Sequence, residues 1–244
     1  MSKDVTIGLV VPFAEDRVPP EGFQMYPNMT FVPRGVGVRS LTPDGYAAAF
    51  DAIPAAADHL AKKGVDAIMV IGTSLTFYRG PDAHNRLLAD LRARTGLPVS
   101  TMSQAIVDGL REVGAKRVAV ATAYTDVVNQ RLKELLEADG VEVRSLECFN
   151  ILEFGGPSRK SEADIIALSN DAVAKAPGAE GILISCGGLR TLGVAKPLED
   201  RHGLPVVSST PAAFWAAMRL IGASGRVAGC GRLLEQSTAP VHAG

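Results

Sequence analysis

Short apolar runs alternate with longer amphipathic runs along almost the whole chain. The apolar runs are brief and mostly continuous, which is typical of parallel strands covered on both faces. We place strands at Thr6–Val11, Ala67–Ile71, around Val99, and at Lys116–Ala121, Val141–Leu146, Ile182–Ile184 and Val206–Val207. We place helices at Pro43–Lys63, Pro81–Thr95, Ser103–Val113, Val127–Asp139, Glu162–Ala176 and Pro211–Ile221. This alternation predicts an α/β fold with helices on both faces of a parallel sheet.

One long stretch, from Phe13 to Pro43, interrupts this pattern. It contains five prolines between Pro19 and Pro43, together with several glycines. A loop of this length is uncommon in a compact protein and usually has a function. We therefore expect an irregular functional loop here.

The two halves of the chain resemble each other. The matching pairs are Thr6–Val11 with Arg117–Ala121, Ile68–Leu75 with Ile182–Leu189, and Thr95–Val99 with His202–Val206, at spacings of about 111, 114 and 107 residues. A duplicated α/β unit explains these spacings and predicts two pseudo-symmetric lobes with a site in the cleft between them. We assign residues 1–115 and roughly 210–244 to the first lobe, and residues 116–209 to the second.

Composition narrows the classes of protein to consider. Of the 244 residues, 47% are hydrophobic and 21% are charged, and the net charge is −1. Nucleic-acid and membrane-surface partners favour a basic face, so we expect neither. No apolar run reaches the roughly 18 residues of a membrane-spanning helix. The first apolar run follows Asp4 and lacks a basic flank, so we interpret it as a strand and not as a signal peptide.

The three cysteines, Cys148, Cys186 and Cys230, are far apart in the sequence. They lack the spacing of zinc ligands or of a disulfide framework, so we predict no metal site. A reducing cytoplasm fits this pattern, and we expect a cytoplasmic monomer. We interpret Cys148 and Cys230 as structural.

Cys186 differs because it ends a predicted buried strand and precedes Gly187 and Gly188. Ligands bind at the carboxyl ends of strands in open α/β sheets. A thiol there can transfer a proton, while backbone N–H groups that no side chain shields can hold an anion. The alternative is that Cys186 is a small buried apolar residue and that the glycines only form a turn.

The repeat places Gly72 opposite Cys186, so the predicted cleft carries one thiol where two were possible. Thr73 and Ser74 follow Gly72 and supply two hydroxyls, and Tyr124 ends a strand of the second half. With the amides after Cys186, these groups form a neutral pocket for a carboxylate or for an enediolate made from one. The alternative is that Thr73 and Ser74 cap the next segment and that Tyr124 is a packing residue.

Other polar residues have simpler interpretations. We expect Ser103 and Asp126 to cap helices, and Arg79 to lie at the cleft mouth or in an ion pair. No G-x-G-x-x-G fingerprint and no Walker loop is present. We expect all four histidines to be surface residues: His59, His84, His202 and His242.

Four segments carry the most specific pattern: GTSLTFYRG at Gly72–Gly80, ATAYTDVVN at Ala121–Asn129, ILISCGGL at Ile182–Leu189 and GLPVVSSTPAAFW at Gly203–Trp215. Together with Val10–Pro12, Tyr26-Pro27 and Leu41–Tyr46, they resemble the arylmalonate decarboxylase family of the aspartate/glutamate racemase superfamily. The resemblance extends from Thr6 to about Leu234. It implies the two-lobed, racemase-like form of the α/β fold, with the active site between the lobes.

The resemblance also implies an activity, the cofactor-independent decarboxylation of α-aryl- or α-alkyl-substituted malonates to enantiopure acids. A small substituted malonate or related dicarboxylate would then be the partner, with no cofactor and no metal. By position, Cys186 would protonate the enediolate. The implied dioxyanion hole consists of Thr73, Ser74, Tyr124 and the amides of Cys186 and Gly187. The implied pocket lining is Pro12, Val38, Leu41, Gly72, Leu75 and Gly188.

Racemases and maleate isomerases of the superfamily carry a cysteine in both halves, whereas this chain has Gly72 in the first. One thiol delivers a proton to one face, which predicts a single enantiomer. Two alternatives stay open: a racemase or maleate-type cis–trans isomerase with a second base, and a non-catalytic dicarboxylate-binding protein. The chain departs from the family pattern at Phe13, Arg39, Arg190 and in the loop Phe149–Arg159.

Overall fold

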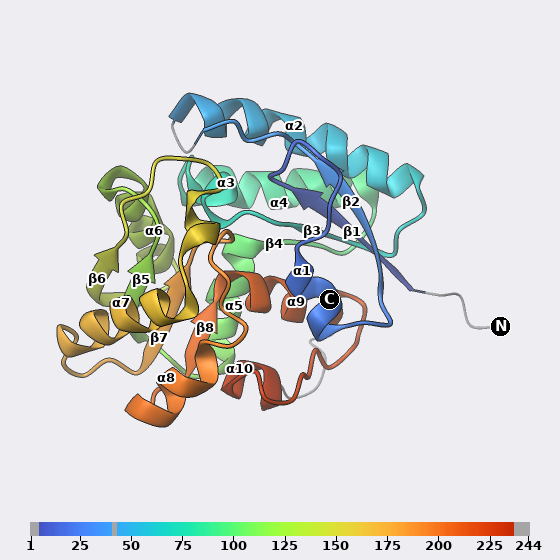
Figure 1. Ribbon diagram of the computed structural model, residues 1–244. Helices are drawn as coiled ribbons and strands as arrows, with labels where there is room; N and C mark the ends of the chain where they lie inside the picture. The colour runs from blue at the N-terminus through green and yellow to red at the C-terminus, as the bar shows by residue number, and fades with distance from the viewer. Residues whose placement is uncertain (1–4, 41–42, 237–244) are drawn as a thin grey trace.

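Two parallel four-stranded sheets form the frame of the molecule (Figure 1). The computed structural model describes residues 5–40 and 43–236. In spatial order, the first sheet consists of β2 (Thr30–Gly35), β1 (Thr6–Val11), β3 (Ala67–Val70) and β4 (Val99–Thr101). The second consists of β6 (Glu142–Cys148), β5 (Arg117–Thr122), β7 (Gly181–Ser185) and β8 (Val206–Ser208). The predicted α/β fold class is confirmed.

Helices surround both sheets (Figure 1). They are α1 (Pro20–Met25), α2 (Pro43–Lys62), α3 (Thr73–Phe77), α4 (Pro81–Thr95), α5 (Met102–Glu112), α6 (Asp126–Ala138), α7 (Glu162–Ala174), α8 (Ala195–His202), α9 (Ser209–Leu220) and α10 (Arg232–Glu235), with a 3₁₀ turn at Gly156–Arg159. Helix α2 packs on β1 and β2, whereas α7 packs on β5 and β6. The six predicted helices are present to within a few residues. The short helices α1, α3, α8 and α10 were not predicted.

The strand order follows the predicted duplication. In the first sheet β1 pairs with β2 and β3, and β4 extends β3; in the second sheet β5 pairs with β6 and β7, and β8 extends β7. All pairs are parallel, so the carboxyl ends of each sheet lie at one edge. Strands β3 and β7 are buried along their whole length, because helices cover both faces.

Helices α5 and α9 join the halves. They pack against each other, and α9 also packs on β3 and β4 of the first sheet. Gly109 of α5 lets the helix approach β8, because a Cβ there would lie 3.1 Å from Cγ1 of Val207. Helix α9 packs on strands of both sheets, and α10, near the end of the same segment, packs on β8 of the second sheet. The division into two lobes stays a prediction.

The expectation of an irregular loop at residues 13–43 was wrong in part, because α1 and β2 lie within it. Its prolines occupy positions where the missing N–H costs little. Pro20 is the first residue of α1, whose N–H has no partner within the helix. Pro33 lies in β2, an edge strand of the first sheet. The many prolines therefore led us to predict irregular backbone where α1 and β2 are present.

Candidate active site

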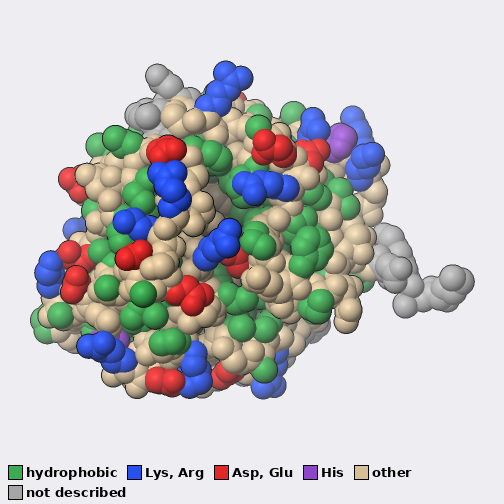
Figure 2. Space-filling view, viewed as in Figure 1, with side chains coloured by type: hydrophobic (Ala, Val, Ile, Leu, Met, Phe, Trp, Pro, Cys, Tyr) green, Lys and Arg blue, Asp and Glu red, His purple; other side chains and the backbone are tan. Residues whose placement is uncertain are grey.

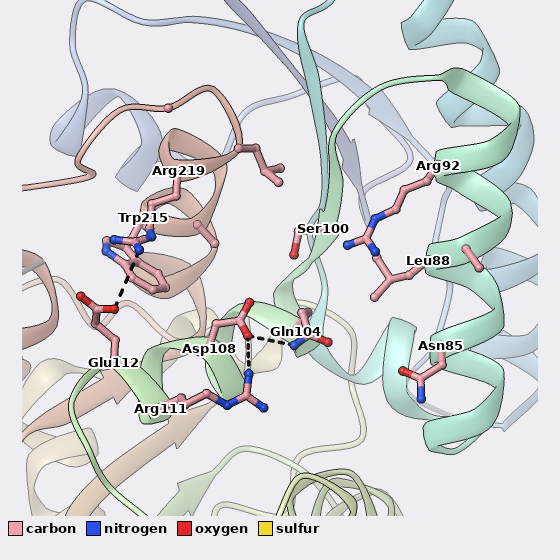
Figure 3. Close-up of a pocket in the computed structure, with 14 residues that line it drawn as sticks. Asn85, Leu88, Arg92, Ser100, Gln104, Asp108, Arg111, Glu112, Trp215 and Arg219 are labelled. Carbon is pink, nitrogen blue, oxygen red and sulfur yellow. Dashed lines mark hydrogen bonds and ion pairs between the residues drawn. The ribbon is translucent and has the colours of Figure 1, made fainter. Parts of the chain in front are cut away.

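Two hollows are the candidates for a functional site. The larger, of about 1060 Å³, lies between α4, α5 and α9 and is drawn in Figure 3. Its side chains bind one another: Asp108 accepts hydrogen bonds from Gln104 at 2.9 Å and Arg111 at 3.2 Å, and Arg219 approaches Glu112 at 3.9 Å. None of the predicted site residues lines this groove.

The groove has a counterpart in the second half that the chain itself fills. Arg92 of α4 donates from Nε and Nη2 to the carbonyl of Val99 in β4, at 3.1 and 3.0 Å. Glu199 of α8, 107 residues later, accepts from the N–H of Val206 in β8 at 2.9 Å. Helix α10 covers this second edge, with Leu233 close to Gly109. In the second half, α10 packs on the edge strand β8. In the first half, no described helix takes the equivalent place beside β4, and the larger groove lies there.

The smaller cavity, of about 190 Å³, contains the predicted site. It lies where β1, β3, β5 and β7 end, as expected for the carboxyl edge of parallel sheets. Leu41 lies outside the described residues. The other predicted residues all line the cavity: Pro12, Val38, Gly72, Thr73, Ser74, Leu75, Tyr124, Cys186, Gly187 and Gly188.

Cys186 directly follows β7, and the residue is 9% exposed. Burial raises its pKa to about 11, although the backbone N–H groups of Gly188 and Leu189 act in the opposite direction. The side chain is therefore a neutral thiol near pH 7, able to donate a proton. The N–H groups of Cys186 and Gly187 donate no hydrogen bond to another described residue, so both remain available to an anion.

Thr73 and Ser74 begin α3 on the other side of the cavity. Gly72 precedes them with φ of +117°, a conformation that strongly favours glycine. The Thr73 hydroxyl donates to Ser209 at 2.9 Å, and its carbonyl accepts from Ser103 at 2.9 Å. The expectation that Ser103 caps a helix was wrong: Thr101 caps α5 by accepting from Gln104 N, which leaves Ser103 to anchor α3.

Two tyrosines complete the polar part of the lining. The Tyr124 hydroxyl lies 3.3 Å from Ser185 Oγ, and its ring packs edge-on against Phe77. Burial raises its pKa well above the usual range, so the phenol stays a donor. Tyr46 was not predicted as a site residue, although it ends one of the quoted motifs. Its buried hydroxyl has no well-formed hydrogen bond to a described residue. Burial raises the pKa of Tyr46, although nearby Ser74 acts in the opposite direction.

Aromatic and charged residues border the cavity where it meets solvent. Phe13 and Phe154 meet edge to face, with ring centroids 6.4 Å apart. The sequence pointed to Phe154 only as a space-filling residue of the divergent loop 149–159. It did not identify Arg17 and Glu21 as lining residues; the only signal for these two was that residues 13–43 were expected to serve a function. Arg190, which also departs from the family pattern, lines the cavity as well.

Several other predictions are settled by burial and bonding. His84 is not a surface residue: it is 2% exposed, its Nε2 lies 2.7 Å from Thr101 Oγ1, and burial lowers its pKa to about 4. Arg79 forms an ion pair with Asp51 at 2.7 Å and does not line the cavity. Asp126 is the first residue of α6, and Thr125 occupies the cap position.

The remaining predicted residues lie away from the cavity. Cys148 ends β6, and Cys148 and Cys230 are half-buried. His59 is exposed and His202 half-buried, while His242 lies outside the described residues. Within residues 5–40 and 43–236, no three His, Cys, Asp or Glu side chains are grouped to hold a metal ion. Over the same residues, no helix is long and apolar enough to cross a membrane.

Fold and site together define a class: a two-sheet α/β enzyme of the aspartate/glutamate racemase superfamily with a cysteine between pseudo-symmetric halves. The family model for arylmalonate decarboxylase matches residues 7–234. The chain belongs to the arylmalonate decarboxylase family, and it is a decarboxylase, that is, a carboxy-lyase.

Individual relatives support this assignment. The chain is 42% identical to arylmalonate decarboxylase of Bordetella bronchiseptica over 233 residues, 95% of this chain and 97% of that one. A liganded double mutant of arylmalonate decarboxylase superposes with a TM-score of 0.93 at 40% identity, covering 96% of this chain and all of the other. Maleate isomerase from Pseudomonas putida S16 shares the fold, with a TM-score of 0.88 at 22% identity over 97% of this chain and all of that one.

Proposed function

We propose that this decarboxylase removes one carboxylate from α-aryl- or α-alkyl-substituted malonates and produces one enantiomer of the remaining acid. The observation that carries the proposal is the pairing, in one cavity, of a protonated Cys186 thiol with unengaged backbone donors. Neutral donors hold a developing negative charge without competing for the proton that must be delivered. The chemistry requires no metal and no cofactor.

In the first step, the donors bind the carboxylate that stays. The groups in this role are Thr73, Ser74, Tyr124 and the amides of Cys186 and Gly187. The C–C bond to the other carboxylate breaks, CO₂ leaves, and the bonding electron pair passes into an enediolate on the retained carboxylate. Charge on that carboxylate rises during the step, so preorganised dipoles lower the barrier more than they stabilise the substrate.

Apolar residues surround the carboxylate that leaves. Pro12, Val38 and Leu75 line the cavity, and we retain Leu41 and the backbone of Gly72 and Gly188 in this predicted lining. An apolar wall disfavours a charged carboxylate relative to neutral CO₂, which assists its departure.

In the second step, Cys186 donates its thiol proton to the α-carbon and becomes a thiolate. Solvent returns a proton to sulfur before the next turnover. The high pKa of the thiol keeps it protonated in the resting enzyme. Gly72 has no side chain with which to protonate the opposite face. Racemisation, which requires an acid and a base on opposite faces, is therefore disfavoured.

The test is CO₂ release from phenylmalonate and α-methyl-α-phenylmalonate, with chiral chromatography of the second product. Wild type, Cys186→Ala and the matched control Cys148→Ala are compared. We expect a single enantiomer from wild type and from the control, and a loss of at least about a thousandfold in Cys186→Ala. Unchanged turnover in Cys186→Ala would remove the thiol from the mechanism. No CO₂ from either substrate would favour isomerase chemistry or binding alone.

We also retain the predicted cytoplasmic monomer as part of the proposal. Light scattering of the purified protein across a concentration series tests the oligomeric state, and a constant dimer mass would contradict it.

A further inference from the structure

We propose that the malonate taken by this enzyme carries a further carboxylate at the end of its α-substituent, and that Arg17 and Arg190 bind this group at the cavity opening. The inference rests on the proposed decarboxylation and concerns the substituent alone. It begins from the charges that border the cavity.

Arg17 and Arg190 are exposed side chains that also line the cavity, which places them where it opens to solvent. Figure 2 shows Lys and Arg side chains bordering a hollow on the visible face. Neither arginine forms an ion pair with a described carboxylate, although neighbouring arginines do. Arg34 pairs with Asp16 at 3.4 Å, and Arg159 pairs with Glu153.

Arg17 is held in place for binding. Its guanidinium carbon lies 3.7 Å from the centre of the Phe13 ring, so one face is stacked while its N–H edge stays free. The supporting loop is anchored to the strand region that follows it: Asp16 accepts from Gly35 N at 2.7 Å, and Phe13 O accepts from Gly37 N at 3.0 Å. A fixed, stacked guanidinium loses less entropy when it binds a carboxylate.

Arg190 is tied to the catalytic turn. It follows Leu189, which is 1% exposed and whose N–H donates to Cys186 O at 3.1 Å. The arginine therefore lies four residues from the thiol, on a turn that is bonded back to it. Because Arg190 and Cys186 line the same cavity, an α-substituent on the carbon facing the thiol can extend to this side chain without leaving the cavity.

Aromatic lining residues and one carboxylate also restrict the kind of α-substituent that the cavity favours. Phe13 and Phe154 contact each other edge to face and add aromatic surface to the lining, which favours an apolar, ring-bearing substituent. Glu21 also lines the cavity, is 6% exposed and has no bonded partner among the described residues. Its carboxylate repels a second one, so a terminal carboxylate on the substituent is favoured next to Arg17 or Arg190. With two cations and one anion, the charged lining remains net positive.

A 4-carboxyphenyl group has these properties, and its reaction balances. The α-carbon of the substrate carries two carboxylates. One of them leaves as CO₂, the α-carbon takes up one proton, and the product is (4-carboxyphenyl)acetate. Only a malonyl carboxylate can leave, because only its C–C bond cleaves to give an enediolate. The electron pair of that bond goes to the enediolate, the proton comes from Cys186, and solvent reprotonates the thiolate. The aryl carboxylate takes no part and serves binding alone.

The experiment compares kcat/KM for (4-carboxyphenyl)malonate, its uncharged amide (4-carbamoylphenyl)malonate, and phenylmalonate. The enzymes are wild type, Arg17→Gln, Arg190→Gln, and Arg144→Gln as a matched control. Arg144 is exposed on β6, pairs with Glu142 at 2.7 Å and does not line the cavity. Wild type and the control are expected to prefer the acid over the amide by about tenfold or more. Each cavity variant should lose most of that preference, because its kcat/KM for the acid falls further than its kcat/KM for the amide.

The outcomes separate the two proposals. Equal kcat/KM for acid and amide in wild type overturns the inference and leaves the decarboxylation intact. A preference that persists in both arginine variants overturns the assignment of these two residues. Absence of CO₂ from all three malonates, phenylmalonate included, overturns the proposed function itself.

Discussion

Cys186 comes directly after β7, and Gly72, 114 residues earlier, follows β3 with one residue between them. Both residues line one cavity, but only Cys186 places a side chain in it. The two halves repeat the same strand order, so the difference between a thiol and a hydrogen at this position makes a pseudo-symmetric site chemically one-sided. A one-sided proton donor is what a stereospecific decarboxylase requires and what a racemase lacks.

Moving the thiol to the other side should invert the product. In Gly72→Cys with Cys186→Gly, the proton would reach the opposite face of the enediolate, and chiral chromatography should give the other enantiomer. Stability should fall, because the Gly72 φ of +117° strains any side chain and a Cβ there would lie 3.2 Å from Leu75 Cβ. We expect a cost of about 1–3 kcal/mol in the free energy of unfolding. Retention of the original enantiomer would contradict the facing-halves arrangement.

The neutral thiol should make stability depend on alkaline pH. The pKa of Cys186 is raised from 9.0 to about 11 in the folded protein, so the stability it contributes is present below pH 9 and is lost as pH rises through 11. The loss should be roughly 2–3 kcal/mol, since one pKa unit corresponds to about 1.4 kcal/mol. Urea unfolding at pH 8 and pH 10.5 should show a steeper decline in wild type than in Cys186→Ala. Equal declines would mean that the folded thiol ionises as it does in the unfolded chain.

The Thr73 hydroxyl should matter more for rate than for stability. Removing one oxyanion donor typically lowers kcat by about 10²–10³-fold, so Thr73→Val should lose that much on phenylmalonate. The free energy of unfolding should fall by about 1–3 kcal/mol, because the buried Ser209 hydroxyl loses its partner. Thr73→Ser keeps the hydroxyl and should recover most of the rate. Ser209→Ala removes the acceptor that the Thr73 hydroxyl engages at 2.9 Å, and a smaller loss is expected because the donor itself remains. Similar rates in Thr73→Val and wild type would remove Thr73 from the dioxyanion hole.

His84 should make the protein sensitive to acid. Burial lowers the pKa of His84 from 6.5 to about 4, so its stabilising effect is present above pH 6.5 and is lost as pH falls towards 4. Wild type should therefore lose about 2–3 kcal/mol more than His84→Gln between pH 7.5 and pH 4. Denaturant unfolding at the two pH values measures this difference. A parallel loss in both proteins would contradict the neutral, buried state.

Short apolar runs located the strands because a strand buried on both faces has to be apolar throughout. That reasoning failed between Phe13 and Pro43. Pro20 and Pro33 suggested irregular backbone, yet they occupy a helix start and an edge strand, where no partner requires the missing N–H. Whether a proline disrupts an element depends on which neighbour faces its nitrogen, and composition alone does not contain that information.

The sequence by itself determined the strand–helix alternation, the duplication and the asymmetry between Gly72 and Cys186, because each is a local pattern or a comparison of local patterns. Only the tertiary structure could bring Arg17 and Glu21 to the same cavity as Arg190, or enclose His84. These residues are far apart along the chain, and their environments arise from packing between segments. Exposure and pKa depend on which groups surround a side chain in space, so they follow from the fold and not from sequence position.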